Sequence, residues 1–222
     1  MNVHRQDSAI EARFNAVARS KTFQNLMQSF RLHEKAVLDV GCSYGEYLTH
    51  FGKGSVGLTV SKEEKQYGEG KGLDVRCWNI ESETFNIEPD FDVIFANNIL
   101  EHLHSPHKFL IKIKGYLREG GILILGVPVV PGFNQLVHVM KFRGSLAVNH
   151  INFFTRFTLV KTTERAGWKV LEARTFRFPF PSADTVLNLI SPHIFTIAVI
   201  DTQFRYHEKR LKELDGYTQI KE

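Results

Sequence analysis

The hydrophobic and polar positions of the chain alternate between short apolar runs and longer amphipathic stretches. Seven mainly apolar runs predict strands, at 36–40, 55–60, 73–78, 91–96, 122–127, 168–178 and 194–200. Apolar residues at helical spacing predict one or two helices within 1–33 and further helices between the strands, one of them at 156–166. This alternation indicates an α/β protein built on a doubly wound, mostly parallel sheet.

The strand predicted at 36–40 ends in a turn with two glycines, Gly41 and Gly45, and a helix is predicted to follow. At a helix start, free backbone N–H groups point outward and can bind an anion or a cofactor. Ser43 occupies the place of the middle glycine of a dinucleotide fingerprint, which is awkward for a pyrophosphate but acceptable for an amino-acid carboxylate. Asp39 suits a ligand that carries an ammonium. A carboxylate, an ammonium and a nucleoside together indicate S-adenosylmethionine.

Two stretches resemble the class I S-adenosylmethionine-dependent methyltransferases. The segment 37–48 resembles their motif I, an acidic residue followed by spaced glycines, with Ser43 as a departure. The run 91–127 resembles their second half: Phe-Asp-Val-Ile, then Leu-Glu-His-Leu, a helix, Gly-Gly and an apolar strand. Leu-Glu-His-Leu and the later His-x-x-Phe-Phe-Thr at 150–155 are similar to segments of small-molecule methyltransferases related to those of quinone biosynthesis. The resemblance implies a Rossmann-like methyltransferase fold, whose seven-stranded sheet ends in an antiparallel hairpin.

The resemblance also places the methionine end of the cofactor at the glycine turn. The residues implied there share one short segment: Asp39, Gly41, Cys42, Ser43 and Gly45.

The next strand ends near Thr59, where these enzymes usually carry an acidic residue for the ribose hydroxyls. The pattern 57–64 resembles one in methyltransferases similar to cyclopropane fatty acid synthases, in which the threonine and a later glutamine serve the cofactor. Glu64 stands at the glutamine position, and its carboxylate can accept hydrogen bonds from both ribose hydroxyls. Alternatively, Ser61 caps a helix whose positive end favours Glu63 and Glu64. The two interpretations are compatible.

Polar residues also follow the third and fourth strands. Asn79 can serve the adenine edge, with Ile80 packed on the ring, or it can close a turn. Asn97 directly follows the fourth strand. Because the carboxyl ends of parallel strands face one crevice, we expect all these residues to border the same cofactor site.

Methyl transfer to an oxygen also requires a base for the acceptor's proton. His102 and His150 are the candidates, since an unperturbed histidine has a pKa of about 6.5. Each can instead be a structural histidine. His102, His104 and His107 do not fit one helix face because Pro106 intervenes, so we expect no metal site.

We expect one methyltransferase domain over 1–222. Its parts, in order, are N-terminal helices at 1–33, a cofactor-binding half at 34–128, an acceptor-side insertion at 129–154, a helix and hairpin at 155–200 and a tail at 201–222. The insertion is expected to carry a short helix around 136–142 and to shape the acceptor pocket.

The composition of the chain limits the kinds of partner that we expect it to bind. The chain is 43% hydrophobic and 23% charged, with a net charge of +4. Its basic residues are scattered, and 97–100 lacks the Pro-Pro-aromatic sequence of base-amine methyltransferases, so a nucleic-acid acceptor is unlikely. Cys42 and Cys77 are interpreted as reduced thiols, and we find no signal peptide or transmembrane run, so a cytoplasmic protein is expected.

The sequence therefore predicts an S-adenosylmethionine-dependent, O-directed methyltransferase with a small-molecule acceptor: a sugar, a lipid-linked compound or a secondary metabolite. The alternative is a protein that keeps the methyltransferase fold but works as a binding or scaffold subunit; Thr59 motivates that alternative. The sequence leaves the oligomeric state open.

Overall fold

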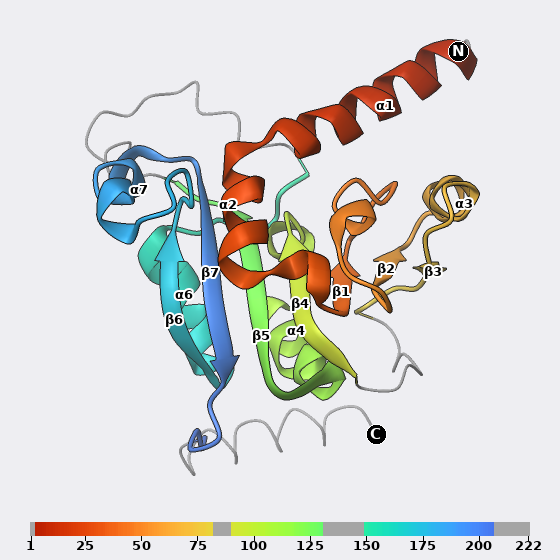
Figure 1. Ribbon diagram of the computed structural model, residues 1–222. Helices are drawn as coiled ribbons and strands as arrows, with labels where there is room; N and C mark the ends of the chain where they lie inside the picture. The colour runs from red at the N-terminus through yellow and green to blue at the C-terminus, as the bar shows by residue number, and fades with distance from the viewer. Residues whose placement is uncertain (1–2, 82–89, 131–148, 207–222) are drawn as a thin grey trace, which may run out of the picture.

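The computed structural model describes residues 3–81, 90–130 and 149–206, which are arranged around one seven-stranded sheet (Figure 1). The strand order is β3-β2-β1-β4-β5-β7-β6. The strands are β1 (Val37–Val40), β2 (Val56–Thr59), β3 (Val75–Cys77), β4 (Phe91–Asn97), β5 (Leu117–Pro128), β6 (Trp168–Arg174) and β7 (His193–Ile200). Every run that the sequence predicts as a strand overlaps one of them. The strands β1, β2, β3 and β6 are shorter than the predicted runs, whereas β4, β5 and β7 extend beyond them.

The five strands from β1 to β5 pair in parallel, whereas β7 is antiparallel to both β5 and β6. The mostly parallel sheet with a C-terminal antiparallel hairpin is therefore confirmed. The order reverses between β1 and β4, and ligands of doubly wound sheets bind at such a switch point, beyond the carboxyl ends of the strands. Val40 pairs with Ala96, so Gly41 and Asn97 leave the sheet side by side.

The two faces of the sheet follow from the alternation of side chains along each strand. In β4, Ile94 and Ala96 pack with residues of α4 (Pro106–Lys112) and α6 (Arg156–Arg165), whereas Val93 and Phe95 pack with α2 (Lys21–Phe30). Figure 1 shows α2 on one face of the sheet and α4 with α6 on the other. By the same alternation, Asn97 points to the α2 face.

The remaining helices are α1 (Val3–Arg19), α3 (Lys62–Gly70) and α7 (Leu187–Ile190). The cap predicted at Ser61 is present, since Ser61 accepts a hydrogen bond at the start of α3. Ser105 caps α4 in the same way. In Figure 1, α1 projects past the sheet on the side of α3. No helix among the described residues combines the length and the apolar character that a membrane span needs.

One predicted element is wrong. No α-helix follows Gly45; a series of turns leads into a short 3-10 helix, Leu48–His50. Ser43 and Gly45 both have left-handed φ angles, +50° and +93°, and Phe51 is already extended. The residues between Gly45 and Phe51 are too few for an α-helix, because their hydrogen bonds do not offset the free energy needed to form the first helical turn. The helix predicted around 136–142, and most of the predicted tail, lie outside the described residues.

A buried ion pair braces the connection from β6 to β7. Nη1 of Arg174 lies 2.6 Å from Oδ2 of Asp184 and also donates to the carbonyl oxygen of Phe178. Nε of Arg174 lies 2.6 Å from Oε1 of Glu172. The guanidinium stacks 3.8 Å from the ring centroid of Phe176. The loop is therefore held against the sheet by one fully engaged arginine.

Candidate functional site

Two cavities open at the carboxyl edge of the sheet, one on each side of the end of β4. The first has a volume of about 330 Å³ and borders the ends of β1, β2 and β3, with Ile99, His102 and Leu103 opposite. The second has a volume of about 520 Å³ and borders α2, the β6–β7 connection and β7. Asn97 and Asn98 line the second cavity, and Ile99 lines the first, so three consecutive residues separate the two.

The glycine turn forms one wall of the first cavity. Gly41 has a left-handed φ of +77°, and a Cβ there would lie 3.2 Å from Cδ1 of Ile99. The N–H groups of Gly41 and Cys42 both donate to the carbonyl oxygen of Leu58, so they are already engaged. The anion site expected from a helix start is therefore absent at these two positions. Ser43 lines the cavity with a left-handed φ of +50°, which explains why glycine suits this position.

Asp39 lies behind the turn, at the end of β1. It is 2% exposed, and its Oδ2 atom is buried without a hydrogen-bond partner among the described residues. Burial, and then the charge of Glu46, hold the pKa of Asp39 well above its usual range. A buried carboxylate oxygen without a partner is costly unless a ligand donates to it.

Arg13 of α1 crosses over the same turn. Its guanidinium lies 2.5 Å from Oε1 of Glu46, donates to Oγ of Ser43 at 3.0 Å and stacks on the ring of Tyr44. An arginine from the first helix thus covers the methionine end of the expected cofactor site.

Glu64 joins three segments at the floor of the first cavity. The Ser43 hydroxyl donates to Oε1 of Glu64 at 3.0 Å, and the Thr59 hydroxyl donates to Oε2. Ser61 at the same time caps α3 by accepting from the N–H of Glu64 at 3.2 Å, so the alternative interpretation, a capped helix, is confirmed. A carboxylate has about four acceptor positions, so Glu64 keeps capacity for ligand hydroxyls.

Asn79 and Ile80 line the far end of the first cavity, beside Trp78. Oδ1 of Asn79 accepts from the N–H of Glu81 at 3.0 Å, which is the turn that the sequence allowed. Ile80 is 7% exposed and belongs to the core. An apolar wall and a polar edge are thus both present at the place predicted for adenine.

Not every predicted cofactor residue reaches this cavity. Those that line it are Gly41, Ser43, Thr59, Glu64, Asn79 and Ile80. Cys42 points into the core against β2, where a Cβ on Gly57 would lie 2.6 Å from its sulfur, and burial raises the pKa of its thiol. Gly45 packs on Leu73. Asn97 lines the second cavity instead.

The predicted bases lie on the side of the first cavity. His102 lines it, and Nδ1 of His102 donates to the carbonyl oxygen of Asn149 at 3.1 Å. The rings of His102 and His150 meet edge to face with centroids 4.8 Å apart. Neither residue lines the second cavity as the described residues form it.

Glu101 completes a cluster that the sequence did not predict. It is 1% exposed, both carboxylate oxygens lack a hydrogen bond within the described chain, and burial raises its pKa. One ligand atom each from Glu101, His102 and His150 lie within 4.8 Å of one another, so these three could hold a metal ion. The three histidines considered in the sequence do not converge: His102, His104 and His107 turn to Asn149, Glu81 and Tyr206, respectively.

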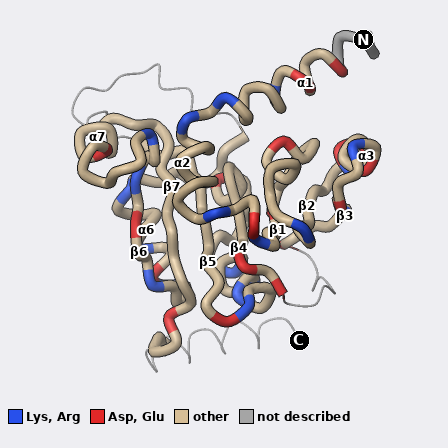
Figure 2. The backbone as a smooth tube through the Cα atoms, viewed as in Figure 1, with Lys and Arg blue, Asp and Glu red and all other residues tan. Residues whose placement is uncertain are grey.

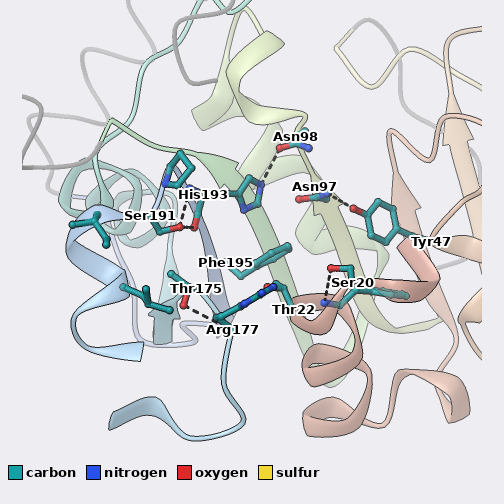
Figure 3. A pocket seen from close by; sticks show the side chains of 14 residues that line it. Ser20, Thr22, Tyr47, Asn97, Asn98, Thr175, Arg177, Ser191, His193 and Phe195 are labelled. Atoms are coloured by element: carbon teal, nitrogen blue, oxygen red, sulfur yellow. Dashed lines mark hydrogen bonds between the residues drawn. The ribbon is translucent and has the colours of Figure 1, made fainter. Parts of the chain in front are cut away.

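The second cavity has a polar end beside β4 (Figure 3). Asn97 donates to the Tyr47 hydroxyl at 3.1 Å, and burial raises the pKa of Tyr47 to about 12, so the phenol stays protonated. Nε2 of His193 donates to Oδ1 of Asn98 at 2.9 Å, which leaves Nδ1 as the acceptor in the neutral ring. Burial lowers the pKa of His193 to about 4, so this ring is neutral at pH 7.

Sequence reasoning missed this cavity. Tyr47, Asn98, Arg177 and His193 come from four separate segments, and Figure 3 shows them around Phe195. The alternation in β7 offered a signal, since His193 lies two residues before Phe195 and shares its face. Gly126 offered another: a Cβ there would lie 2.2 Å from Oδ1 of Asn97 and 2.5 Å from the Phe195 ring, so only glycine leaves room for both.

A family model described as a methyltransferase domain matches residues 11–173. (S)-coclaurine N-methyltransferase of Papaver somniferum is 31% identical over 102 residues, which are 41% of this chain and 29% of that protein. A tRNA U34 carboxymethyltransferase of Pseudoalteromonas translucida is 27% identical over 157 residues, 64% of this chain and 47% of that protein. The chain thus spans less than half the length of these two curated relatives in the matched regions.

Solved structures share the fold. A putative methyltransferase of Haloferax volcanii, in complex with the Trm112 methyltransferase activator, superposes with a TM-score of 0.60 over 88% of this chain and 93% of that one. The two sequences are 18% identical, so the likeness concerns the fold alone.

Proposed function

Because the chain belongs to the methyltransferase-domain family, we propose that it transfers a methyl group from S-adenosylmethionine to an oxygen atom of a small molecule. S-adenosylmethionine supplies a methyl group already activated on a sulfonium. The residues of the protein therefore have to bind the two reactants, align them, exclude water and take up one proton.

The first cavity fits this cofactor by its donor and acceptor pattern. The unpartnered Oδ2 of Asp39 can accept from the ammonium group, and the spare acceptor positions of Glu64 match the two ribose hydroxyls. Asn79 and Ile80 supply the polar edge and apolar wall for adenine. Asp39, Gly41, Ser43, Thr59, Glu64, Asn79 and Ile80 are thus proposed to bind the cofactor, with Cys42 and Gly45 shaping the turn.

The position of the second cavity carries the proposal. It lies on the other side of the end of β4 from the first cavity, where Gly41 and Asn97 leave the sheet side by side. An acceptor in the second cavity would lie beside the methionine end of the cofactor. Its volume of about 520 Å³ falls in the range of small-molecule sites, about 300–1,000 Å³.

A small acceptor is also favoured over a nucleic acid. In Figure 2, Lys and Arg are spread over several elements and interleaved with Asp and Glu, and nucleic-acid binding requires a concentrated basic surface. The names of the curated relatives include a small-molecule acceptor, coclaurine, and a nucleic-acid acceptor, tRNA. The second cavity, with its volume of about 520 Å³, supports the first of these.

We propose His193 as the group that accepts the hydrogen bond of the acceptor's hydroxyl and orients it, because it lines the second cavity with a neutral ring whose Nδ1 is an acceptor. Its pKa of about 4 makes the ring a weaker base than an ordinary histidine. The sequence predicts His150 and His102 as bases. Both lie beside the first cavity, and their role as bases stays a prediction. Replacing each histidine with alanine separates the three. Turnover that falls only in His193→Ala supports this assignment, and turnover that falls only in His150→Ala or His102→Ala contradicts it.

The test is transfer from trideuteromethyl S-adenosylmethionine to a panel of phenols, sugars, lipid-like alcohols and amines, with tRNA as a separate arm. We expect the label on a hydroxyl compound, detected by mass spectrometry. A label on tRNA alone would reject the small-molecule acceptor. No label together with no binding of S-adenosylhomocysteine would favour the scaffold alternative.

A further inference from the structure

The charges around the second cavity are unbalanced. Among the described residues that line it, Arg177 is the only one with a permanent charge, and none is Asp or Glu. The start of α2 also lines the second cavity, through Ser20, Thr22 and Phe23. The positive end of the helix dipole therefore adds to the positive charge of Arg177. The bound cofactor would bring a further positive charge on its sulfonium.

Arg177 is also free of partners. Within the described part of the chain, its guanidinium makes neither an ion pair nor a hydrogen bond. The contrast is Arg174, three residues earlier, which is buried and bound to both Glu172 and Asp184. The connection between β6 and β7 thus carries one arginine that holds the fold and one whose donors are available to a ligand.

The backbone under Arg177 is braced. Its N–H donates to Oγ1 of Thr175 at 3.4 Å, and the N–H of Thr175 donates to Oδ1 of Asn188 at 3.0 Å. On the other side, the N–H of Phe178 donates to Asp184 at 3.2 Å. A braced backbone fixes the point from which the exposed Arg177 side chain extends, so only the side chain has to be ordered when it binds an anion.

The cavity is polar at both ends and apolar between them. Figure 3 shows Arg177 reaching toward Thr22 on one side of Phe195, while His193 and Asn98 lie on the other side. Phe23, Leu187 and Ile190 add apolar surface. A ligand that fits has an apolar body, a group for Arg177 at one end and a hydroxyl for His193 at the other.

We propose that the methyl acceptor carries an anionic group, a carboxylate or a phosphate, and that Arg177 binds this group in the second cavity. The inference rests on the proposed function. A guanidinium presents paired N–H donors that match both oxyanions. The same charge disfavours amine acceptors, which would place an ammonium between Arg177 and the sulfonium.

The test measures binding to the protein saturated with S-adenosylhomocysteine, by calorimetry. Four probes share a phenol and differ in one group: 4-hydroxybenzoate, 4-hydroxyphenyl phosphate, neutral 4-hydroxybenzamide and cationic tyramine. We expect at least one anion to bind about tenfold or more tightly than the amide, and tyramine to bind more weakly than the amide. The two anionic probes decide between carboxylate and phosphate.

Variants assign the effect to Arg177. Arg177→Gln should abolish the preference for the anion while the affinities for the amide and for S-adenosylhomocysteine stay unchanged. Lys169→Gln removes an exposed positive charge in β6 that does not line the second cavity, and it should leave the preference for the anion intact. Equal binding of anions and amide, no binding of any probe, or a preference that survives in Arg177→Gln would each overturn the inference.

The two proposals fail differently. If S-adenosylhomocysteine itself does not bind, the proposed function is wrong. If it binds and the anion preference is missing, only the anionic acceptor is rejected.

Discussion

At the scale of single residues, Glu64 shows how one carboxylate organises a binding site. It accepts hydroxyl hydrogen bonds from Ser43 in the glycine turn and from Thr59 at the end of β2. Thr59 replaces an acidic residue that the resemblance led us to expect. The carboxylate of Glu64, from the first turn of α3, accepts from the Thr59 hydroxyl and so lies at the end of β2, where we expected the acidic residue.

We predict that Glu64→Ala weakens the binding of S-adenosylhomocysteine about 10- to 100-fold, since charge-assisted hydrogen bonds contribute about 1.5–3 kcal/mol. Glu63→Ala is the matched control, because Glu63 occupies the same helix turn but does not line the first cavity. Calorimetry measures both. Equal affinity losses in the two variants would show that the loss comes from a disturbed α3 and not from a lost contact between Glu64 and the cofactor.

His193 should make stability depend on pH. Its pKa is lowered to about 4, whereas a histidine in the unfolded chain has a pKa of about 6.5. Between these values the unfolded chain binds more protons than the native protein, so stability is present above 6.5 and is lost as the pH falls toward 4. Between pH 7 and pH 5 we expect the wild type to lose about 2 kcal/mol more than His193→Gln.

Urea midpoints at the two pH values measure this difference. His33→Gln removes an exposed histidine and serves as the control. A loss in His193→Gln as large as that in the wild type would show that another group is responsible.

At the scale of elements, the β6–β7 connection depends on the contact between Arg174 and Asp184. Asp184 is completely buried and accepts both from Arg174 and from the N–H of Phe178. Removing one partner of a buried pair leaves an uncompensated charge.

We therefore predict that Asp184→Ala lowers the free energy of unfolding by about 3–5 kcal/mol. Glu172→Gln, at the more exposed partner of the same arginine, should cost less, about 1 kcal/mol. Denaturant unfolding of both variants measures this. Equal and small losses would mean that the connection does not depend on the buried pair.

The strands and helices also show which features could be predicted from the sequence. Buried strands appear as apolar runs, so the strands and the residues at their carboxyl ends, such as Ser43 and Asn79, were found correctly. The helix after Gly45 was not, because left-handed φ angles at Ser43 and Gly45 leave no trace in apolar spacing. The interruption depends on backbone geometry rather than on hydrophobicity.

At the scale of the whole molecule, the second cavity could not be predicted because its walls are distant in sequence. α2, the end of β4 and β7 meet only after the sheet has formed, and Asn98 and His193 are separated by 95 positions. Local alternation indicates that His193 and Phe195 share one face of β7, but it does not indicate which distant segments they contact. The cofactor cleft is different, since each strand end contributes its own residues and the parallel topology brings them together.

The central claim is that the cleft beside the glycine turn binds S-adenosylmethionine. The most direct measurement is calorimetric titration of S-adenosylhomocysteine into the wild type, Gly41→Ala and Gly120→Ala. Both glycines have similar left-handed φ angles, +77° and +74°, but a Cβ meets Ile99 in the cleft only at Gly41 and meets nothing within 4 Å at Gly120. We predict binding to the wild type and to Gly120→Ala, and an affinity at least about tenfold weaker for Gly41→Ala. No binding to the wild type at millimolar ligand, or equal affinity in all three proteins, would contradict this account.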